Sequence, residues 1–127
     1  RLPMGDVPPI LILDEELRIV DITASAAAIL GMPADALVGL TVESQAAAHD
    51  AHPPVPWRAL VDGAGSDIAG VAAWAVPDIG QVIIWCLARR DVPIPGRHAV
   101  VVRRHQDPPL VAEDLDRALA EAFERRT

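Results

Sequence analysis

Two histidines have the spacing of a metal site. His49 and His52 are three positions apart, so on a helix their imidazoles would share one face, with Asp50 close by. Such a pair can ligate zinc or haem iron. A structural zinc needs four ligands, however, and no CxxC motif or second HxxH completes the set. Because prolines follow at 53, 54 and 56, we favour the alternative that both histidines lie exposed at a helix end or in a loop.

No nucleophile is accompanied by an evident activating base. Cys86 is the single cysteine, so it cannot form an internal disulfide, and its apolar neighbours indicate a small buried hydrophobic residue. Ser25, Ser44 and Ser66 are the serines, and no GxSxG, HExxH or glycine-rich phosphate loop is present. The sequence therefore predicts no enzyme, and a small stand-alone enzyme ranks below the binding roles considered next.

Basic side chains gather in one short stretch. Residues 89–104 hold five arginines and one aspartate, a local charge of +4 in a chain of net charge −7. Guanidinium groups can hold an anionic ligand or an acidic partner. The alternative, which we favour, is that they are solvated residues that protect a sheet edge from pairing. Net acidity and the lack of interleaved aromatic and basic residues argue against direct nucleic-acid binding. The arginines concerned are Arg89, Arg90, Arg97, Arg103 and Arg104.

Hydrophobic patterning predicts the strands that must position these groups. The expected strands cover residues 10–13, 17–22, 67–76, 81–89 and 98–104. An acidic turn at 14–16 joins the first two. The third and fourth flank the turn at 77–80, which predicts an antiparallel hairpin.

Short helices are expected between the second and third strands. Residues 24–30 are rich in alanine, with Thr23 or Ser25 as the N-cap and Gly31 as a left-handed C-cap. Further short helices are expected from Pro33 to Gly39, over 41–52 and around 57–62.

The last segment, residues 110–126, has the pattern of an amphipathic helix. Apolar residues repeat on one face, with charged residues on the other. This stripe can fold back on the chain's own sheet or pair with a second copy, and the spacing does not decide between the two. We take the stripe as the candidate homodimer interface: Val111, Leu115, Ala118, Leu119, Ala122 and Phe123.

The start of the chain resembles a PAS domain. In ILILDEELRIVDITASAAAILGMPADALVG, residues 10–39, two strands around an acidic turn precede a small-residue helix ending in Leu-Gly, followed by Pro-x-x-x-Leu-x-Gly. Thr23 departs from the asparagine common at this position in the family. The resemblance extends over about residues 8–105, although only the first part is motif-like. It implies an α+β fold with a five-stranded antiparallel sheet, short helices on one face and a C-terminal amphipathic helix.

The resemblance also implies a role. PAS domains act as sensory or dimerisation modules in signalling and transcription-regulating proteins, and some hold a ligand between helices and sheet. The Asn-Cys-Arg-Phe-Leu-Gln motif of flavin photosensors is absent, and Cys86 falls on a predicted strand, so neither a flavin-cysteine adduct nor a cinnamoyl-type chromophore is expected. Haem would use His49 or His52. The cofactor is otherwise unknown.

Candidate pocket residues come from the predicted strands. Alanine and glycine dominate around residue 74, so helices can approach the sheet closely or leave a cavity, and close packing is the default. Alternation puts Ile84 and Trp85 on opposite faces without indicating which face is inward. The candidate ligand-contacting residues are Trp74, Ile83, Ile84, Trp85, Val101 and Arg103.

Composition bounds the setting. The sequence lacks Lys, Asn and Tyr and has no apolar run long enough for a membrane span, which suggests a cytoplasmic protein of a high-GC bacterium. We expect a PAS-like domain over residues 1–107 and a linker or dimerisation helix over 108–127, relaying to an output domain of a longer parent protein. The alternative is a homodimerisation module without a ligand.

Overall fold

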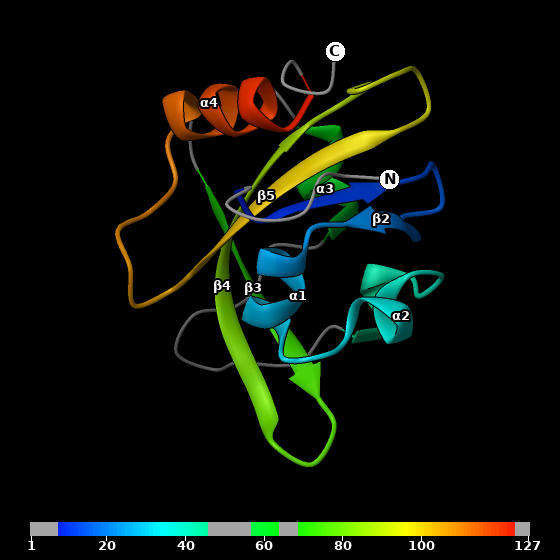
Figure 1. Ribbon diagram of the computed structural model, residues 1–127, viewed down its shortest axis with the longest axis vertical. Coiled ribbons are helices and arrows are strands. Elements are labelled where there is room, and N and C mark those ends of the chain that lie inside the picture. Colours follow the sequence, from blue (N-terminus) through cyan, green and yellow to red (C-terminus); the bar gives the residue numbers. More distant parts are fainter. Residues whose placement is uncertain (1–7, 46–56, 64–68, 124–127) are drawn as a thin grey trace.

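The computed structural model describes residues 8–45, 57–63 and 69–123. Within these ranges the chain forms strands, short helices and one longer C-terminal helix (Figure 1). The elements are β1 (Ile10–Leu13), β2 (Ile19–Ile22), α1 (Ala24–Leu30), α2 (Ala34–Leu37), the 3-10 helix η1 (Val42–Gln45), α3 (Trp57–Asp62), β3 (Gly70–Val76), β4 (Gly80–Arg89), β5 (His98–Arg104) and α4 (Ala112–Phe123).

The five strands form one antiparallel sheet in the order β2-β1-β5-β4-β3. The central contact joins the two ends of the chain, because β1 pairs with β5 from Ile10 opposite Val101 to Leu13 opposite His98. The five-stranded sheet is therefore complete only when β1 has paired with β5. The predicted α+β architecture is confirmed.

A threonine organises the junction between β2 and α1. The Thr23 hydroxyl oxygen accepts hydrogen bonds from the Ile10 amide at 3.0 Å and from the Ala26 amide at 3.2 Å. It also lies 3.2 Å from the Pro8 carbonyl oxygen, to which it donates. One side chain thus caps α1 and ties it to the start of β1. The predicted N-cap is confirmed at Thr23, and Gly31 ends the helix at φ 72° as expected.

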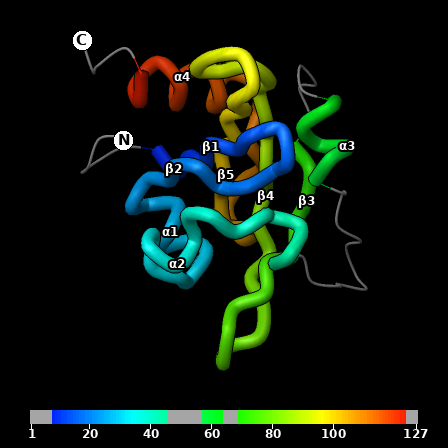
Figure 2. The backbone as a smooth tube through the Cα atoms, turned by 90° about the vertical axis from the view of Figure 1, so that its right-hand side faces the viewer, coloured from blue at the N-terminus to red at the C-terminus, as the bar shows by residue number. Residues whose placement is uncertain are grey.

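One face of the sheet, here called the helical face, is covered by α1, α2, η1 and α3. Figure 2 shows α1 and α2 near β1 and β2, while α3 lies beside β3. Small residues of α1, Ala26 and Ala27, allow close approach to the strands, and the buried cluster continues through Trp57 of α3. The strands contribute Leu11, Leu13, Ile19, Ile22, Ala72, Trp74, Val76, Ile84, Cys86, Ala88, Val100 and Val102 to this cluster.

The opposite face, here called the α4 face, is covered by the terminal helix. In Figure 1, α4 lies across one end of the sheet, on the other side from α1 and α2. Its apolar stripe packs on alternate residues of the same strands, so each strand buries both faces where α4 covers it. This second cluster contains Ile10, Ile12, Leu87, Ala99, Val101, Leu110, Leu115, Ala118 and Ala122.

The element boundaries differ from expectation in a few places. β3 begins at Gly70, while residues 67 and 68 of the predicted strand lie outside the described residues. Of the helix predicted over 41–52, only η1 is described, and it is a 3-10 helix. His49 and His52 also lie outside the described residues. None of the helices in the described ranges is long and apolar enough to cross a lipid bilayer.

Candidate functional site

The six predicted pocket residues lie on both faces of the sheet. Trp74 and Ile84 are fully buried on the helical face. Val101 and Trp85 belong to the cluster of the α4 face, and Ile83 and Arg103 share that face by strand alternation. The sheet therefore separates Trp74 from Val101 and Arg103, whereas Ile83 and Ile84 both border one groove at the end of β4. Whether any of them contacts a ligand stays a prediction.

Trp74 has a buried donor on the helical face. Its indole Nε1 lacks a hydrogen-bond acceptor within the described residues. The ring of Trp57 lies edge-on to it, with centroids 6.4 Å apart and planes at 83°. An unpaired buried N–H lowers the stability of the folded chain. A hydrogen-bond acceptor placed within reach of Trp74 Nε1 would therefore be bound favourably.

Cys86 lies in the same cluster. Burial raises the pKa of its thiol, because the thiolate would lose its hydration there. The side chain therefore packs as a small apolar group.

The fold buries some residues of the predicted dimer interface and leaves others partly or largely exposed. Leu115, Ala118 and Ala122 are buried against the sheet of their own chain. Leu119 and Phe123 are half-buried beside them, and Val111 is 50% exposed. In this structure the stripe folds back on its own chain, so most of it is not available to a second copy.

Two ion pairs also fasten α4 to the sheet. Arg89 of β4 pairs with Asp116 at 2.7 Å, and Arg103 of β5 lies 3.5 Å from Asp114. Asp114 also accepts a hydrogen bond from the Val111 amide at 3.0 Å, which caps the helix. All four charged groups reach solvent, so each pair contributes modestly.

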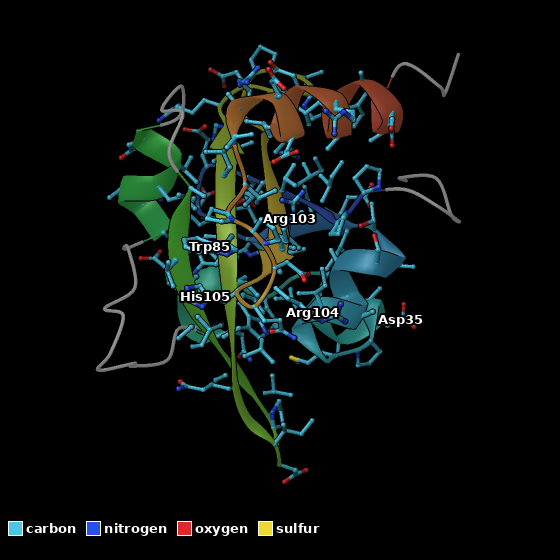
Figure 3. All side chains as sticks on the ribbon, turned by 90° about the vertical axis from the view of Figure 1, so that its left-hand side faces the viewer. Asp35, Trp85, Arg103, Arg104 and His105 are labelled. Atoms are coloured by element: carbon cyan, nitrogen blue, oxygen red, sulfur yellow. The ribbon has the colours of Figure 1, made fainter. Side chains whose placement is uncertain are left out.

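The segment between β5 and α4 is held by the α4 face of the sheet. Trp85 Nε1 donates to the Asp107 carbonyl at 3.0 Å, and Arg103 donates to the Pro108 carbonyl at 3.2 Å. The His105 ring lies against the Trp85 ring, with centroids 4.5 Å apart. Figure 3 labels Trp85, His105 and Arg103 below α4. Two residues predicted for a pocket thus anchor the linker to the terminal helix.

One groove lies where α1 faces the ends of β4 and β5. It has a volume of about 440 Å³ and is open to solvent. Arg104 is directly opposite Ile84 in the pairing of β5 with β4, so a guanidinium lies beside an apolar side chain on the helical face. The groove is lined by Ile29, Gln81, Val82, Ile83, Ile84, Arg104, His105 and Gln106.

The arginine-rich stretch separates into different roles. Arg89, Arg90 and Arg103 pair with Asp116, Asp62 and Asp114 respectively. The Arg104 guanidinium, in contrast, has no ion pair or hydrogen bond within the described parts of the chain, although the Arg104 carbonyl accepts from the Asp107 amide.

A third group gathers at the opposite end of β5. Ligand atoms of Glu15, Asp91 and His98 lie within 4.8 Å of one another. The Asp91 amide donates to His98 Nδ1 at 3.1 Å, so the ring proton is on Nε2, which lies 2.6 Å from the Glu15 carboxylate.

This arrangement does not suit a metal. A histidine that binds a metal through Nε2 donates a proton from Nδ1, where the Asp91 amide already points. Arg90 also lies 4.0 Å from the same Glu15 oxygen. The buried His98 therefore serves as a structural link between the β1–β2 turn and the β4–β5 loop.

Sequence reasoning missed three of these groups. His98, Gln81 and Gln106 carry no local motif, and His98 meets Glu15 across 83 positions. Only the strand register could have indicated them. Arg104 was included in the basic stretch, but its difference from Arg103 depends on which face each side chain occupies.

No protein-family model matches the sequence, and no curated protein matches it either. Among solved structures, the PAS domain of an HTR-like protein from Haloarcula marismortui aligns with a TM-score of 0.60 at 14% identity, covering 79% of this chain and 83% of that one. A domain of the sensory box sensor histidine kinase/response regulator from Geobacter sulfurreducens aligns at 0.57, with 15% identity and coverage of 79% and 85%.

The PAS domain of nitrogen regulation protein NR(II) from Vibrio parahaemolyticus aligns with a TM-score of 0.55 at 17% identity, covering 79% of this chain and 91% of that one. All three alignments are consistent with the five-stranded antiparallel sheet and the helices described above. At these identities the likeness concerns the fold. The chain has the fold of a PAS domain.

Proposed function

We propose that this chain is a sensory or regulatory module of a bacterial signalling or transcription-regulating protein in the cytoplasm. It would bind a small ligand or a protein partner and relay that event through α4 to an output domain. The similar solved domains include one from a sensor histidine kinase/response regulator, which supports a signalling role. Residues 1–107 would form the sensing part and residues 108–127 the linker.

The way α4 is attached carries this proposal. Of its buried residues, only Leu115 is large, while Ala118 and Ala122 bury little apolar area. The remaining attachment within the described residues consists of the half-buried Leu119 and Phe123 and the two solvent-accessible ion pairs. A helix held this weakly can leave the sheet while the rest stays folded, and a relay requires two such states.

Hydrogen exchange by NMR tests the proposal. We expect the amides of α4 to exchange through an opening that costs less free energy than the opening of β1 and β5. If the α4 amides exchange only with global unfolding, α4 has no second state and the relay is wrong. Native mass spectrometry on the same sample reports subunit number and any retained small molecule.

A homodimerisation module is the second candidate. Half-buried apolar residues, Val71, Ile83 and Trp85, lie on β3 and β4 on the same face as α4. A second copy could cover them, with Val111 at the edge. Sedimentation equilibrium decides this candidate: a concentration-independent monomer would exclude it.

A further inference from the structure

The groove between α1 and the ends of β4 and β5 has two chemically different walls. Ile29 of α1 faces Val82 and Ile84 of β4, and these three side chains form the apolar wall. Arg104 and Gln106 form the polar wall. Gln81 also borders the groove, but strand alternation directs its side chain to the opposite face of β4. The register explains the division, because the β5 residue opposite Ile84 is Arg104.

The polar wall holds donors that nothing else in the described chain uses. The Arg104 guanidinium and the Gln106 carboxamide lack hydrogen-bond partners among the residues that the structure describes. β5 also extends beyond its described pairing with β1, which ends at Ile10 opposite Val101. Figure 3 shows Arg104 at the end of the strand, on the side of α1.

The charge of the polar wall indicates which class of ligand the groove can bind. One guanidinium with one carboxamide matches a monoanionic head group, since a carboxylate accepts two parallel N–H bonds from an arginine. A phosphate dianion would call for additional cations. The apolar wall and the volume of about 440 Å³ suit a small aliphatic or aromatic body attached to that head.

We propose that this groove binds a small carboxylate with an apolar body, its carboxylate on Arg104 and its body against Ile29, Val82 and Ile84. This inference rests on the proposed sensory function and names its ligand class. Binding would join α1 to the ends of β4 and β5.

The site is placed to influence α4. Arg103, the residue before Arg104, points to the opposite face of β5, where it contacts Asp114 of α4 and the Pro108 carbonyl. A ligand that fixes the end of β5 therefore acts one residue from the contacts that hold the linker and the helix.

The test is an NMR titration of the ¹⁵N-labelled chain with sodium 4-phenylbutyrate, with the neutral 4-phenylbutanamide and with inorganic phosphate. We expect saturable shifts at the amides around Ile29, Ile84 and Arg104, and an affinity for the acid about tenfold higher than for the amide. Arg104→Gln should remove this preference. Arg18→Gln, at an exposed arginine remote from the groove, is the matched control and should keep it.

Several results would overturn the inference. These are equal affinity for acid and amide, equal behaviour of the two variants, phosphate binding as tightly as the acid, or no shifts at millimolar acid. The α4 amides separate this inference from the proposed function. If the acid shifts the amides of the groove but not those of α4, the relay is contradicted and the binding site is retained. If the acid shifts the α4 amides without shifting those of the groove, the binding site is contradicted and the relay is retained.

Discussion

The two faces of the sheet are covered by different physical means. The helical face is covered by four short elements whose side chains form one continuous apolar cluster around Leu30 and Trp74. The α4 face is covered by one helix with a narrower apolar stripe and two ion pairs to strand residues. Apolar burial is insensitive to salt, while solvent-accessible ion pairs weaken with it.

This contrast teaches where a conformational change can occur at low cost. Opening the helical face would expose the core that holds the sheet together. Releasing α4 would expose a smaller apolar surface and leave every strand pair intact. The comparison therefore predicts global effects from substitutions on one face and local effects on the other.

The largest expected effect is on the helical face. Leu30→Ala removes a fully buried side chain between α1 and the sheet and should lower the free energy of unfolding by about 3 kcal/mol. Urea denaturation followed by circular dichroism measures it. Reaction of the Cys86 thiol with a disulfide reagent should accelerate as well, because this buried cysteine reacts only when the core opens.

Val38→Ala is the control for this loss, since Val38 is 47% exposed. It should change stability by less than about 0.5 kcal/mol. A Leu30→Ala protein as stable as wild type would mean that the helical face does not hold the fold.

The matching substitution on the α4 face is Leu115→Ala. Leu115 is the one large buried residue of α4, so its loss should favour helix opening by about 2 kcal/mol. Hydrogen exchange should accelerate at the α4 amides while those of β1 and β5 change little. The rate of Cys86 labelling should stay near that of wild type. An equal acceleration in α4 and in the central strands would contradict the division between the two faces.

The polar junction at Thr23 should have an intermediate effect. Thr23→Val keeps the shape but removes the acceptor of the Ile10 and Ala26 amides, at an expected cost of about 1–2 kcal/mol. Thermal unfolding measures this change. Thr41→Val is the matched control, because the Thr41 hydroxyl has no hydrogen bond to the described part of the chain. A similar loss of stability in both variants would contradict the role of the Thr23 oxygen.

The sequence predicts best those parts of the fold that depend on interactions between residues close together in the chain. The Thr23 cap, the Gly31 stop and the first two strands were predictable, because neighbouring residues determine them. The hairpin of β3 and β4 followed from two apolar runs around one turn. These local signals together were enough to indicate a PAS-like order of elements.

The candidate site was less predictable, because it depends on register and on coverage of the faces. Alternation separates Ile84 from Trp85, but only the packed helices show that Ile84 faces α1. Likewise, Arg103 and Arg104 are alike in sequence. The first meets Asp114 because α4 covers its face, while the second opens into the groove.

The smallest expected effect concerns the ion pairs of α4. Asp116→Asn breaks the pair with Arg89, whose side chain is 36% exposed, and should cost about 0.5 kcal/mol at low salt. The loss should shrink as sodium chloride is raised, because ions screen an exposed pair, and hydrogen exchange of the α4 amides at two salt concentrations measures it. Glu113→Gln removes a carboxylate from the exposed side of the same helix without an ion pair to the described strands, so it controls for net charge. If both substitutions increase the opening of α4 equally at low salt, the net charge of the helix and not the Arg89 contact holds it on the sheet. The contrast between the two faces then depends only on the size of their apolar clusters.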